Sequence, residues 1–218
     1  MNIAIDGPAG AGKSTIAKLA AERLGYIYVD TGAMYRAIAL FFIKNGTDVN
    51  NENEVTAACS EITVEIKYED GVQNVYLNGE NVSSEIRQEQ VGNMASKAAA
   101  KKPVRDKLLS LQRDIAASAD VIMDGRDIGT FVLPGAELKI YLTASVETRA
   151  RRRYDELVAK GEQPEISRIE EDIRQRDYQD MHRDIAPLAQ AEDAVYLDTS
   201  NMSIDEVVQF ICDRTGAL

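Results

Sequence analysis

The stretch Gly7-Pro8-Ala9-Gly10-Ala11-Gly12-Lys13-Ser14-Thr15 decides the fold class of this chain. Gly7, Gly12 and the Lys13-Ser14 pair have the spacing of a phosphate-binding loop. Glycines let successive backbone N–H groups converge on phosphate oxygens, because no Cβ stands in the way. Lys13 would reach the β- and γ-phosphates of a nucleotide, and the Ser14 hydroxyl would be a ligand of Mg²⁺. All nine residues are therefore expected to hold a nucleoside triphosphate.

The sequence on either side of this loop fits a strand–loop–helix unit. Residues 2–6 are a short apolar run, typical of a buried strand, and apolar residues recur at helical spacing through residues 14–24. The positive N-terminal end of that helix would point at the phosphates. A chance glycine turn is the alternative, but at ordinary glycine usage the pattern arises in only about one per cent of chains this long.

Bulk composition excludes several classes of protein. The 218 residues carry a formal net charge of −11, which disfavours nucleic-acid binding because that needs a basic surface. The sequence has no apolar run long enough for a membrane span. The first strand begins almost at once, so we expect no signal peptide and a cytoplasmic location.

Short apolar runs alternate with helical sequence along the rest of the chain. We expect strands at residues 2–6, 26–30, 121–124, 138–143 and 194–198. We expect helices at residues 14–24, 33–44, 51–61, 84–100, 103–117, 146–160, 167–181 and 204–215. This alternation predicts an α/β fold with a five-stranded parallel sheet. Polar residues at strand ends, such as Asp30, Asp124 and Thr143, would then lie at the ligand-binding edge of the sheet.

Residues 62–83 break this pattern. Residues 62–68 and 74–78 alternate with a period of two, and Glu69-Asp70-Gly71 between them is a turn signal. A third strand is expected near residues 81–83. We therefore predict a small antiparallel hairpin inserted into the α/β core.

Three arginine-rich segments follow the third strand of the core. In Asp124-Gly125-Arg126-Asp127-Ile128-Gly129, an Arg-Asp pair between glycines suits close approach of a ligand, and an ordinary turn with a surface ion pair is the alternative. Further on, Arg149 and Arg152 share one helix face, with Arg153 beside it. We expect residues 149–168, approximately, to form a mobile lid whose arginines close on the triphosphate; a solvated helix surface is the alternative.

The third segment contains Arg176, Asp180 and Arg183, spaced to form one stripe on a helix. A clamp on ribose and phosphate is the functional interpretation. A helix face that carries only salt bridges is the alternative.

Together these residues resemble the bacterial cytidylate kinase family. The resemblance covers essentially the whole chain and rests on residues 5–15, Asp30-Thr-Gly-Ala-Met-Tyr-Arg36, residues 124–130, and Arg176-Asp177 with Asp180, Arg183 and Ala186-Pro187-Leu188. Many phosphate-loop proteins share the first motif, whereas the other three in this order are specific. The resemblance implies ATP- and Mg²⁺-dependent phosphorylation of CMP and dCMP. It also implies one three-layer kinase domain over residues 1–218, with a lid and an acceptor-binding insertion at about residues 33–100.

The resemblance further implies a role for each matched residue. Thr31, where the family often has Ser, and Asp127 would contact the cytosine amino group, and Arg105 would donate to N3 and O2 of the base. The sugar would be held by Ser96, Arg176 and Asp180. The acceptor phosphate would be held by Arg36, Arg126 and Arg183. Catalysis would fall to Lys13, Arg126, Arg149, Arg152 and Arg183.

The chemistry of the base supports this selection. Cytosine presents an amino donor at N4 and an unprotonated acceptor at N3, which match a carboxylate and an arginine, whereas uracil would leave both protein groups unpaired. A phosphate acceptor has a second pKa of about 6, so no strong general base is needed. Alignment and charge neutralisation by Lys13, Mg²⁺ and the arginines would carry catalysis.

Two other functions stay open at this point. One is another phosphate-loop kinase with a small acceptor. The other is a nucleotide-binding switch without transfer activity, although the Asn-Lys-x-Asp motif usual in such switches does not occur in the sequence. In each case the partner would be a small molecule, and the family expectation is a monomer.

Overall fold

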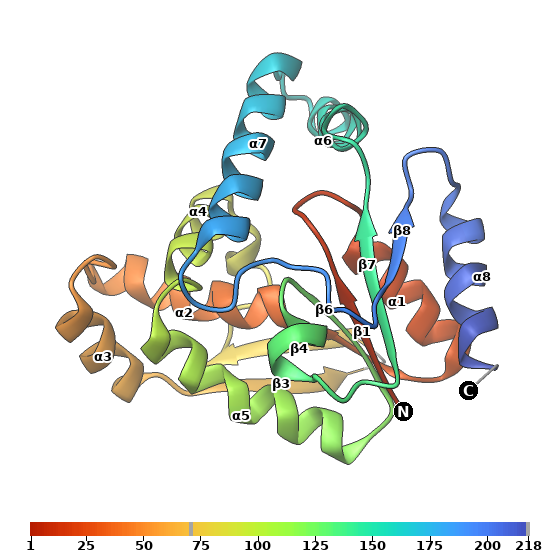
Figure 1. The fold of residues 1–218 in the computed structure, drawn as a ribbon. Helices are drawn as coiled ribbons and strands as arrows, with labels where there is room; N and C mark the ends of the chain where they lie inside the picture. Colours follow the sequence, from red (N-terminus) through yellow and green to blue (C-terminus); the bar gives the residue numbers. More distant parts are fainter. Residues whose placement is uncertain (70–71, 217–218) are drawn as a thin grey trace. The chain divides into compact units, whose positions relative to one another are not determined.

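The computed structural model describes residues 1–69 and 72–216 (Figure 1). The chain forms two compact units. The first consists of residues Met1–Tyr28 and Ala119–Leu218, and the second of residues Val29–Ser118. The second unit includes all of the segment 33–100 that the resemblance marks as an insertion.

The core of the molecule is a five-stranded sheet in the order β2-β6-β1-β7-β8. Its strands are β1 (Asn2–Asp6), β2 (Ile27–Asp30), β6 (Val121–Gly125), β7 (Leu138–Thr143) and β8 (Val195–Asp198). Strand β1 lies in the middle and pairs in parallel with β6 and β7, and β7 pairs in parallel with β8. The expected parallel sheet is thus confirmed, with all five strands within about two residues of their predicted limits.

Two helices of the first unit pack together on one face of this sheet. They are α1 (Lys13–Leu24) and α8 (Ile204–Thr215), which lie side by side in Figure 1. Their apolar faces bury Ile16, Val207 and Ile211 against Ile3 and Ile140 of the sheet. This packing fixes the start of α1, and therefore the phosphate loop, relative to the end of β1.

Helices α6 (Val146–Ala159) and α7 (Ile166–His182) form a helical hairpin within the first unit. Gly161 in the connection has a φ of 82°, a left-handed conformation that glycine adopts readily. Helix α7 ends at His182, and Arg183 has φ −69° and ψ 144°, so its backbone is extended. The prediction that Arg183 continues the helical stripe of Arg176 and Asp180 is therefore wrong.

The second unit combines helices with a small sheet. Its helices are α2 (Thr31–Asn45), α3 (Glu52–Glu61), the short η1 (Glu85–Arg87), α4 (Glu89–Ala98) and α5 (Lys102–Ser118). Its sheet consists of β3 (Val64–Glu69), β4 (Val72–Leu77) and β5 (Glu80–Asn81), paired antiparallel in that order. The predicted hairpin and third strand are confirmed, while Asp70 and Gly71 of the predicted turn lie outside the described residues.

One predicted helix, residues 84–100, is divided in the structure. Gln88 between η1 and α4 is extended, with φ −64° and ψ 147°. A continuous helix would place Ile86 and Val91 about 140° apart around its axis. Both side chains are fully buried, and the break at Gln88 allows this. Apolar burial thus overrides the helical pattern of the sequence.

Candidate active site

The phosphate loop connects β1 to α1 through a backbone that only glycine adopts easily. Gly7, Gly10 and Gly12 have φ values of 152°, 74° and 89°. A Cβ on Gly7 would collide with the carbonyl oxygen of Leu142. The first turn of α1 carries no acidic residue, so no carboxylate there competes with a bound anion for the N–H groups. The predicted loop Gly7–Thr15 therefore has the geometry of an anion site.

Lys13 lies in the first turn of α1 and is almost fully buried. Its Nζ donates a hydrogen bond of 2.8 Å to the carbonyl oxygen of Pro8. Burial, and then the nearby charge of Arg126, lower the pKa of Lys13 to about 7, against the opposing effect of Asp124 and Asp6. A bound polyanion would favour the charged ammonium again, so this lysine is suited to meet phosphate.

Ser14 is held by a carboxylate from the neighbouring strand. Its Oγ donates to Asp124 Oδ2 at 2.9 Å, and the Tyr28 hydroxyl donates to Asp124 Oδ1 at 3.0 Å. The β1–β6 register places Asp124 opposite Ile5, just before the loop begins. Hydroxyl and carboxylate oxygens are donors that Mg²⁺ accepts, directly or through water.

The arginines of α6 reach back to the phosphate loop. Arg149 Nη1 donates to Ala9 O at 2.9 Å, and Arg152 Nη1 donates to Ala11 O at 3.3 Å. The predicted common face of these two arginines is confirmed, since both side chains end at the loop. Arg153, by contrast, is half-buried and pairs with exposed Glu156.

Arg149 is also fixed from α7. Its Nη1 and Nη2 donate to the two oxygens of Asp177 at 3.1 and 2.6 Å, and its Nε donates to Ala144 O at 2.9 Å. A bidentate pair of this kind is among the stronger hydrogen-bonded contacts in proteins. Asp177, which had no predicted role beyond its motif, thus holds in place an arginine of α6 that contacts the phosphate loop.

A cluster of four charged side chains lies at the end of β6 and the end of α7. We call Arg126, Asp127, Asp180 and Arg183 the acceptor cluster. Arg126 Nε donates to Asp180 Oδ2 at 2.8 Å, and Arg183 Nη2 donates to Asp127 Oδ1 at 3.1 Å. The sequence pattern placed only two of these residues, Asp180 and Arg183, together, on one helix face. The structure pairs each arginine with a carboxylate more than fifty residues away in the chain.

Electrostatics within the acceptor cluster favour the charged forms. Burial alone would raise the pKa of Asp180, but Arg126, Arg176 and Arg183 bring it below its ordinary value. Burial would likewise lower the pKa of Arg126, but the Asp180 carboxylate raises it. Arg176, half-buried on α7, therefore acts on the same carboxylate. The cluster carries two positive and two negative charges before any anion enters.

The remaining predicted substrate residues lie in the second unit. Thr31 is buried at the first position of α2, directly after Asp30, whose side chain caps the helix. Arg36 Nη1 donates to Ile86 O at 3.1 Å, and its guanidinium lies against Gly92. Arg105 is buried and donates to Ala99 O at 3.2 Å.

Ser96 completes this set of the second unit. It is half-buried on α4, four residues after Gly92. Helices α2 and α4 pack closely, so Ser96 and Arg36 are carried by adjoining helices.

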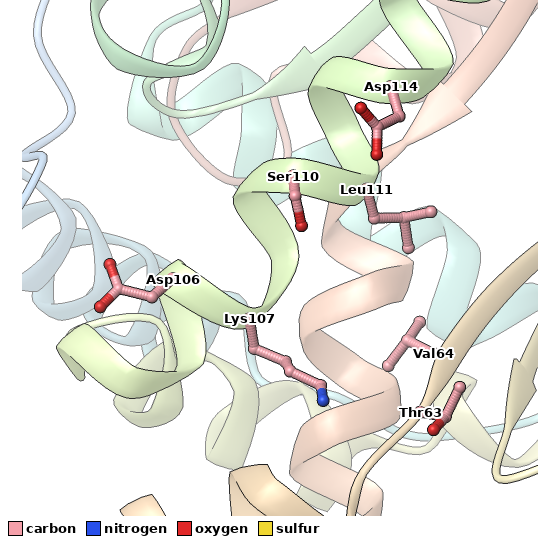
Figure 2. Close-up of a pocket in the computed structure, with 7 residues that line it drawn as sticks. All are labelled: Thr63, Val64, Asp106, Lys107, Ser110, Leu111 and Asp114. Atoms are coloured by element: carbon pink, nitrogen blue, oxygen red, sulfur yellow. The ribbon is translucent and has the colours of Figure 1, made fainter.

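A separate hollow of about 390 Å³ also lies in the second unit (Figure 2). It is lined by Thr63, Val64, Asp106, Lys107, Ser110, Leu111 and Asp114. In Figure 2, Lys107 and Leu111 project from α5 on the side of Thr63 and Val64, whereas Asp106 projects away. None of the predicted substrate residues lines this hollow, so it is distinct from the candidate site.

Asp6 is the residue that the sequence motifs overlook most clearly. It is a buried carboxylate at the end of β1, adjacent to the phosphate loop. The signal was present in the sequence, since a charged residue closes an otherwise apolar strand. Its partners, Ile128 and Gly129, lie more than 120 residues away and could not be read from that signal.

The parallel sheet, the glycine loop at the head of α1 and the arginines around it define a phosphate-loop enzyme that transfers phosphoryl groups. Residues 3–216 match the family model described as cytidylate kinase. The chain belongs to the cytidylate kinase family, and it is a nucleoside monophosphate kinase.

Relatives support this assignment over nearly the full chain. The sequence is 51% identical to the cytidylate kinase of Lactobacillus johnsonii over 213 residues, which cover 98% of this chain and 93% of the relative. It is 52% identical to the cytidylate kinase of Lactobacillus gasseri over 213 residues, with the same two coverages. Among solved structures, it is similar to an uncharacterized protein from Eubacterium ventriosum. That likeness has a TM-score of 0.57 at 9% identity and covers 100% of this chain and 99% of the other. At so low an identity it shows the fold alone.

No helix among residues 1–69 and 72–216 combines the length and apolarity that crossing a bilayer requires.

Proposed function

We propose that residues 7–15 hold ATP while this chain phosphorylates CMP and dCMP, the reaction of the family to which it belongs. The observation that carries this proposal is the loop itself. Three glycines in positive φ lead into the positive end of α1, and a buried lysine lies in the first turn. Such a loop binds the phosphates of a nucleotide through successive N–H groups.

On the donor side, Lys13, Arg149 and Arg152 would neutralise the developing charge on the transferred phosphoryl group. All three now donate to carbonyl oxygens of residues 8–11. A phosphate oxygen is a better partner than a carbonyl oxygen because the contact is charge-assisted. If phosphate oxygens replaced these carbonyl oxygens as acceptors, the arginines of α6 would contact the triphosphate. The α6–α7 hairpin would then act as the lid.

The oxygen donors beside the loop fit Mg²⁺. Ser14 would bind the ion directly, and Asp124, which accepts from Ser14, would act through water or orient the serine. Held there, the ion would supply positive charge against the phosphates.

On the acceptor side, the acceptor cluster would recognise both the base and the phosphate. Asp127 accepts from Arg183, and an ionised carboxylate can accept several hydrogen bonds at once, which suits the cytosine amino group. Arg126 and Arg183 would hold the acceptor phosphate. Arg176 and Asp180 would hold the sugar. A uracil ring would present an acceptor to the Asp127 carboxylate, and this mismatch would exclude UMP.

The second unit would supply the rest of the acceptor site. Thr31 would offer its hydroxyl to the cytosine amino group, and Arg105 would donate to the edge of the base. Arg36 would contact the acceptor phosphate, and Ser96 the sugar. We therefore propose that residues 29–118 are the acceptor-binding subdomain of the kinase.

No general base is required for this transfer. The acceptor phosphate is largely dianionic at neutral pH, since its second pKa is about 6. The single histidine, His182, is exposed at the end of α7, where its ring stacks on Tyr178. Alignment and charge neutralisation would carry the chemistry.

An acceptor panel tests the proposal. Purified protein with Mg²⁺ and ATP would be given CMP, dCMP, UMP, AMP, GMP or shikimate, and ADP release would be measured. We expect CMP and dCMP to exceed all others. Preferential transfer to another acceptor would overturn the roles of the acceptor cluster, and ADP release with none of them would overturn the proposal as a whole.

Two coarser proposals accompany this one. We propose that the chain acts in the cytoplasm and as a monomer of 24.0 kDa. Sedimentation at micromolar concentration would check the oligomeric state.

A further inference from the structure

A buried carboxylate beside the phosphate loop has no part in the roles assigned above. Asp6 closes β1 and directly precedes Gly7. Its side chain is among the most buried charged groups of the chain, with 5% exposure. Burying a carboxylate is unfavourable unless its oxygens are hydrogen-bonded, so its contacts should explain why it is there.

Both oxygens of Asp6 accept backbone N–H groups from one loop. Oδ1 accepts from Ile128 at 2.8 Å, and Oδ2 accepts from Gly129 at 2.7 Å. These distances are short for N–H donors, as expected for an ionised acceptor. Because the two donors are adjacent in the chain, the carboxylate fixes both the position and the direction of the backbone there.

Gly129 leaves the space for this contact. A Cβ built on Gly129 would lie 3.4 Å from Asp6 Oδ2 and 3.1 Å from Lys139 Cδ. The backbone of the loop thus lies directly against the carboxylate, where a larger residue would force its neighbours apart.

The loop held in this way is the one that carries Arg126 and Asp127. Before them, the β1–β6 register fixes Gly125 opposite Asp6. After them, Asp6 fixes Ile128 and Gly129. Asp127 itself has φ −147° and ψ 26°, outside the regular helix and strand regions, and its carbonyl accepts the N–H of Phe131 at 2.9 Å. Both ends of this two-residue segment are therefore anchored to the end of β1.

Asp6 is still mostly charged at neutral pH, although its surroundings raise its pKa. Burial raises its pKa to about 6, although the N–H groups of Gly129 and Ile128 oppose the shift. Asp127 raises it further and Lys13 lowers it. The carboxylate is thus mostly ionised near pH 7, and only the ionised form can accept two N–H groups without a competing O–H.

We propose that Asp6 is a positioning residue for acceptor recognition, which holds the Arg126–Asp127 segment in place through the N–H groups of Ile128 and Gly129. This inference rests on the proposed roles of Arg126 and Asp127. Asp6 touches neither substrate in this account and acts through the loop alone.

The variant Asp6→Asn tests the inference with a side chain of nearly the same shape. Its amide has a single oxygen acceptor, and its NH₂ group would face one of the two N–H donors. We expect kcat/KM for CMP to fall about 10- to 100-fold, the range for loss of one hydrogen bond to a charged group. The KM for ATP should change less than about twofold, because the glycine loop keeps its own backbone contacts. A rise in the KM for ATP as large as the fall in kcat/KM for CMP would overturn the inference.

A matched control lies at the other end of the same strand. Glu137 accepts the N–H of Asn2 at 2.7 Å, and its side chain is exposed. Glu137→Gln makes the same carboxylate-to-amide change just before β7, against the start of β1 and away from the loop, so we expect wild-type kinetics for both substrates.

A double-mutant cycle separates positioning from general stabilisation. If Asp6 acts through Asp127, the pair Asp6→Asn and Asp127→Asn should lower kcat/KM for CMP little beyond Asp127→Asn alone. Simple additivity of the two losses would overturn the inference. The preference of the wild type for CMP is measured first. If the wild type does not prefer CMP, the proposed function itself is wrong. If it does prefer CMP and the losses of the two variants are additive, only the role of Asp6 is wrong.

Amide hydrogen exchange of the wild-type chain provides a test that needs no variant. If Asp6 holds the loop beforehand, the N–H groups of Ile128 and Gly129 should be protected before CMP is added. Protection that arises only after CMP binds would overturn the inference.

Discussion

The phosphate loop and the acceptor cluster are two proposed anion sites of the same unit, built in different ways. The loop is nine consecutive residues, and its donors are backbone N–H groups placed by Gly7, Gly10 and Gly12. The acceptor cluster consists of side chains whose paired residues lie 54 and 56 positions apart. A backbone site depends on local conformation, whereas a side-chain site depends on the whole fold. The first should therefore be lost by changing one residue, and the second should weaken in steps.

The largest effect should come from Lys13, the charged side chain of the loop itself. We expect Lys13→Ala to lower kcat by about 10³-fold or more, because a buried charge at the transferred phosphoryl group is lost. Steady-state kinetics with CMP would measure this, and circular dichroism would check that the fold persists. Lys18→Ala, on the exposed side of the same helix, is the control and should change kcat less than about twofold. Near-normal turnover in folded Lys13→Ala would contradict the role of Lys13.

A change in the loop backbone should come next. In Gly7→Ala, the new methyl group would meet Leu142 O, and the φ of 152° would be strained. We expect a loss of on the order of 3 kcal/mol in unfolding free energy, which corresponds to a fall in Tm of about 6–12 °C for a chain of this size. Calorimetry would measure it. Gly135→Ala, where a Cβ meets nothing within 4 Å, should leave Tm nearly unchanged. A Gly7→Ala melting curve equal to that of Gly135→Ala would show that the loop tolerates side chains.

Ion pairs on α7 offer a third comparison, between a buried and an exposed contact. Asp177→Ala removes the bidentate partner of buried Arg149, and we expect a loss of about 2 kcal/mol in unfolding free energy. Glu170→Ala removes the partner of exposed Arg174 on the same helix and should lose less than about 0.5 kcal/mol. Urea denaturation would measure the unfolding free energy of both variants. Equal losses would mean that the buried pair adds nothing beyond a surface contact.

The smallest effect concerns pH. Burial lowers the pKa of Lys13 to about 7 in the folded chain, while an unfolded lysine has its ordinary value of 10.5. Between these values the unfolded state binds more protons, so the folded state gains stability as pH rises. Relative to Lys13→Met, we expect wild-type unfolding free energy to rise by about 1 kcal/mol between pH 7 and 8. Urea titrations at both pH values would show this. A difference independent of pH would mean that Lys13 stays fully charged in the absence of nucleotide.

The same comparison explains how much the sequence could predict. The loop, the parallel strands and the small antiparallel sheet follow from local patterns, and each is found where it was expected. The helix over residues 84–100 and the helical position of Arg183 were wrong, because burial of Ile86 and Val91 and the end of α7 at His182 depend on tertiary packing. Asp6 and Asp177 gained their roles only in three dimensions, since their partners are distant in the chain or on another helix.

The most direct measurement of the central claim is the ratio of kcat/KM for CMP to that for UMP in the wild type and in Asp127→Asn. Asp184→Asn, an exposed neighbour of Arg183, serves as the control. If Asp127 reads the cytosine amino group, the wild-type ratio should exceed about 100 and should fall at least about tenfold in Asp127→Asn, as expected for one base contact. An unchanged ratio in Asp127→Asn, with CMP still preferred, would contradict the account and place base recognition outside the acceptor cluster.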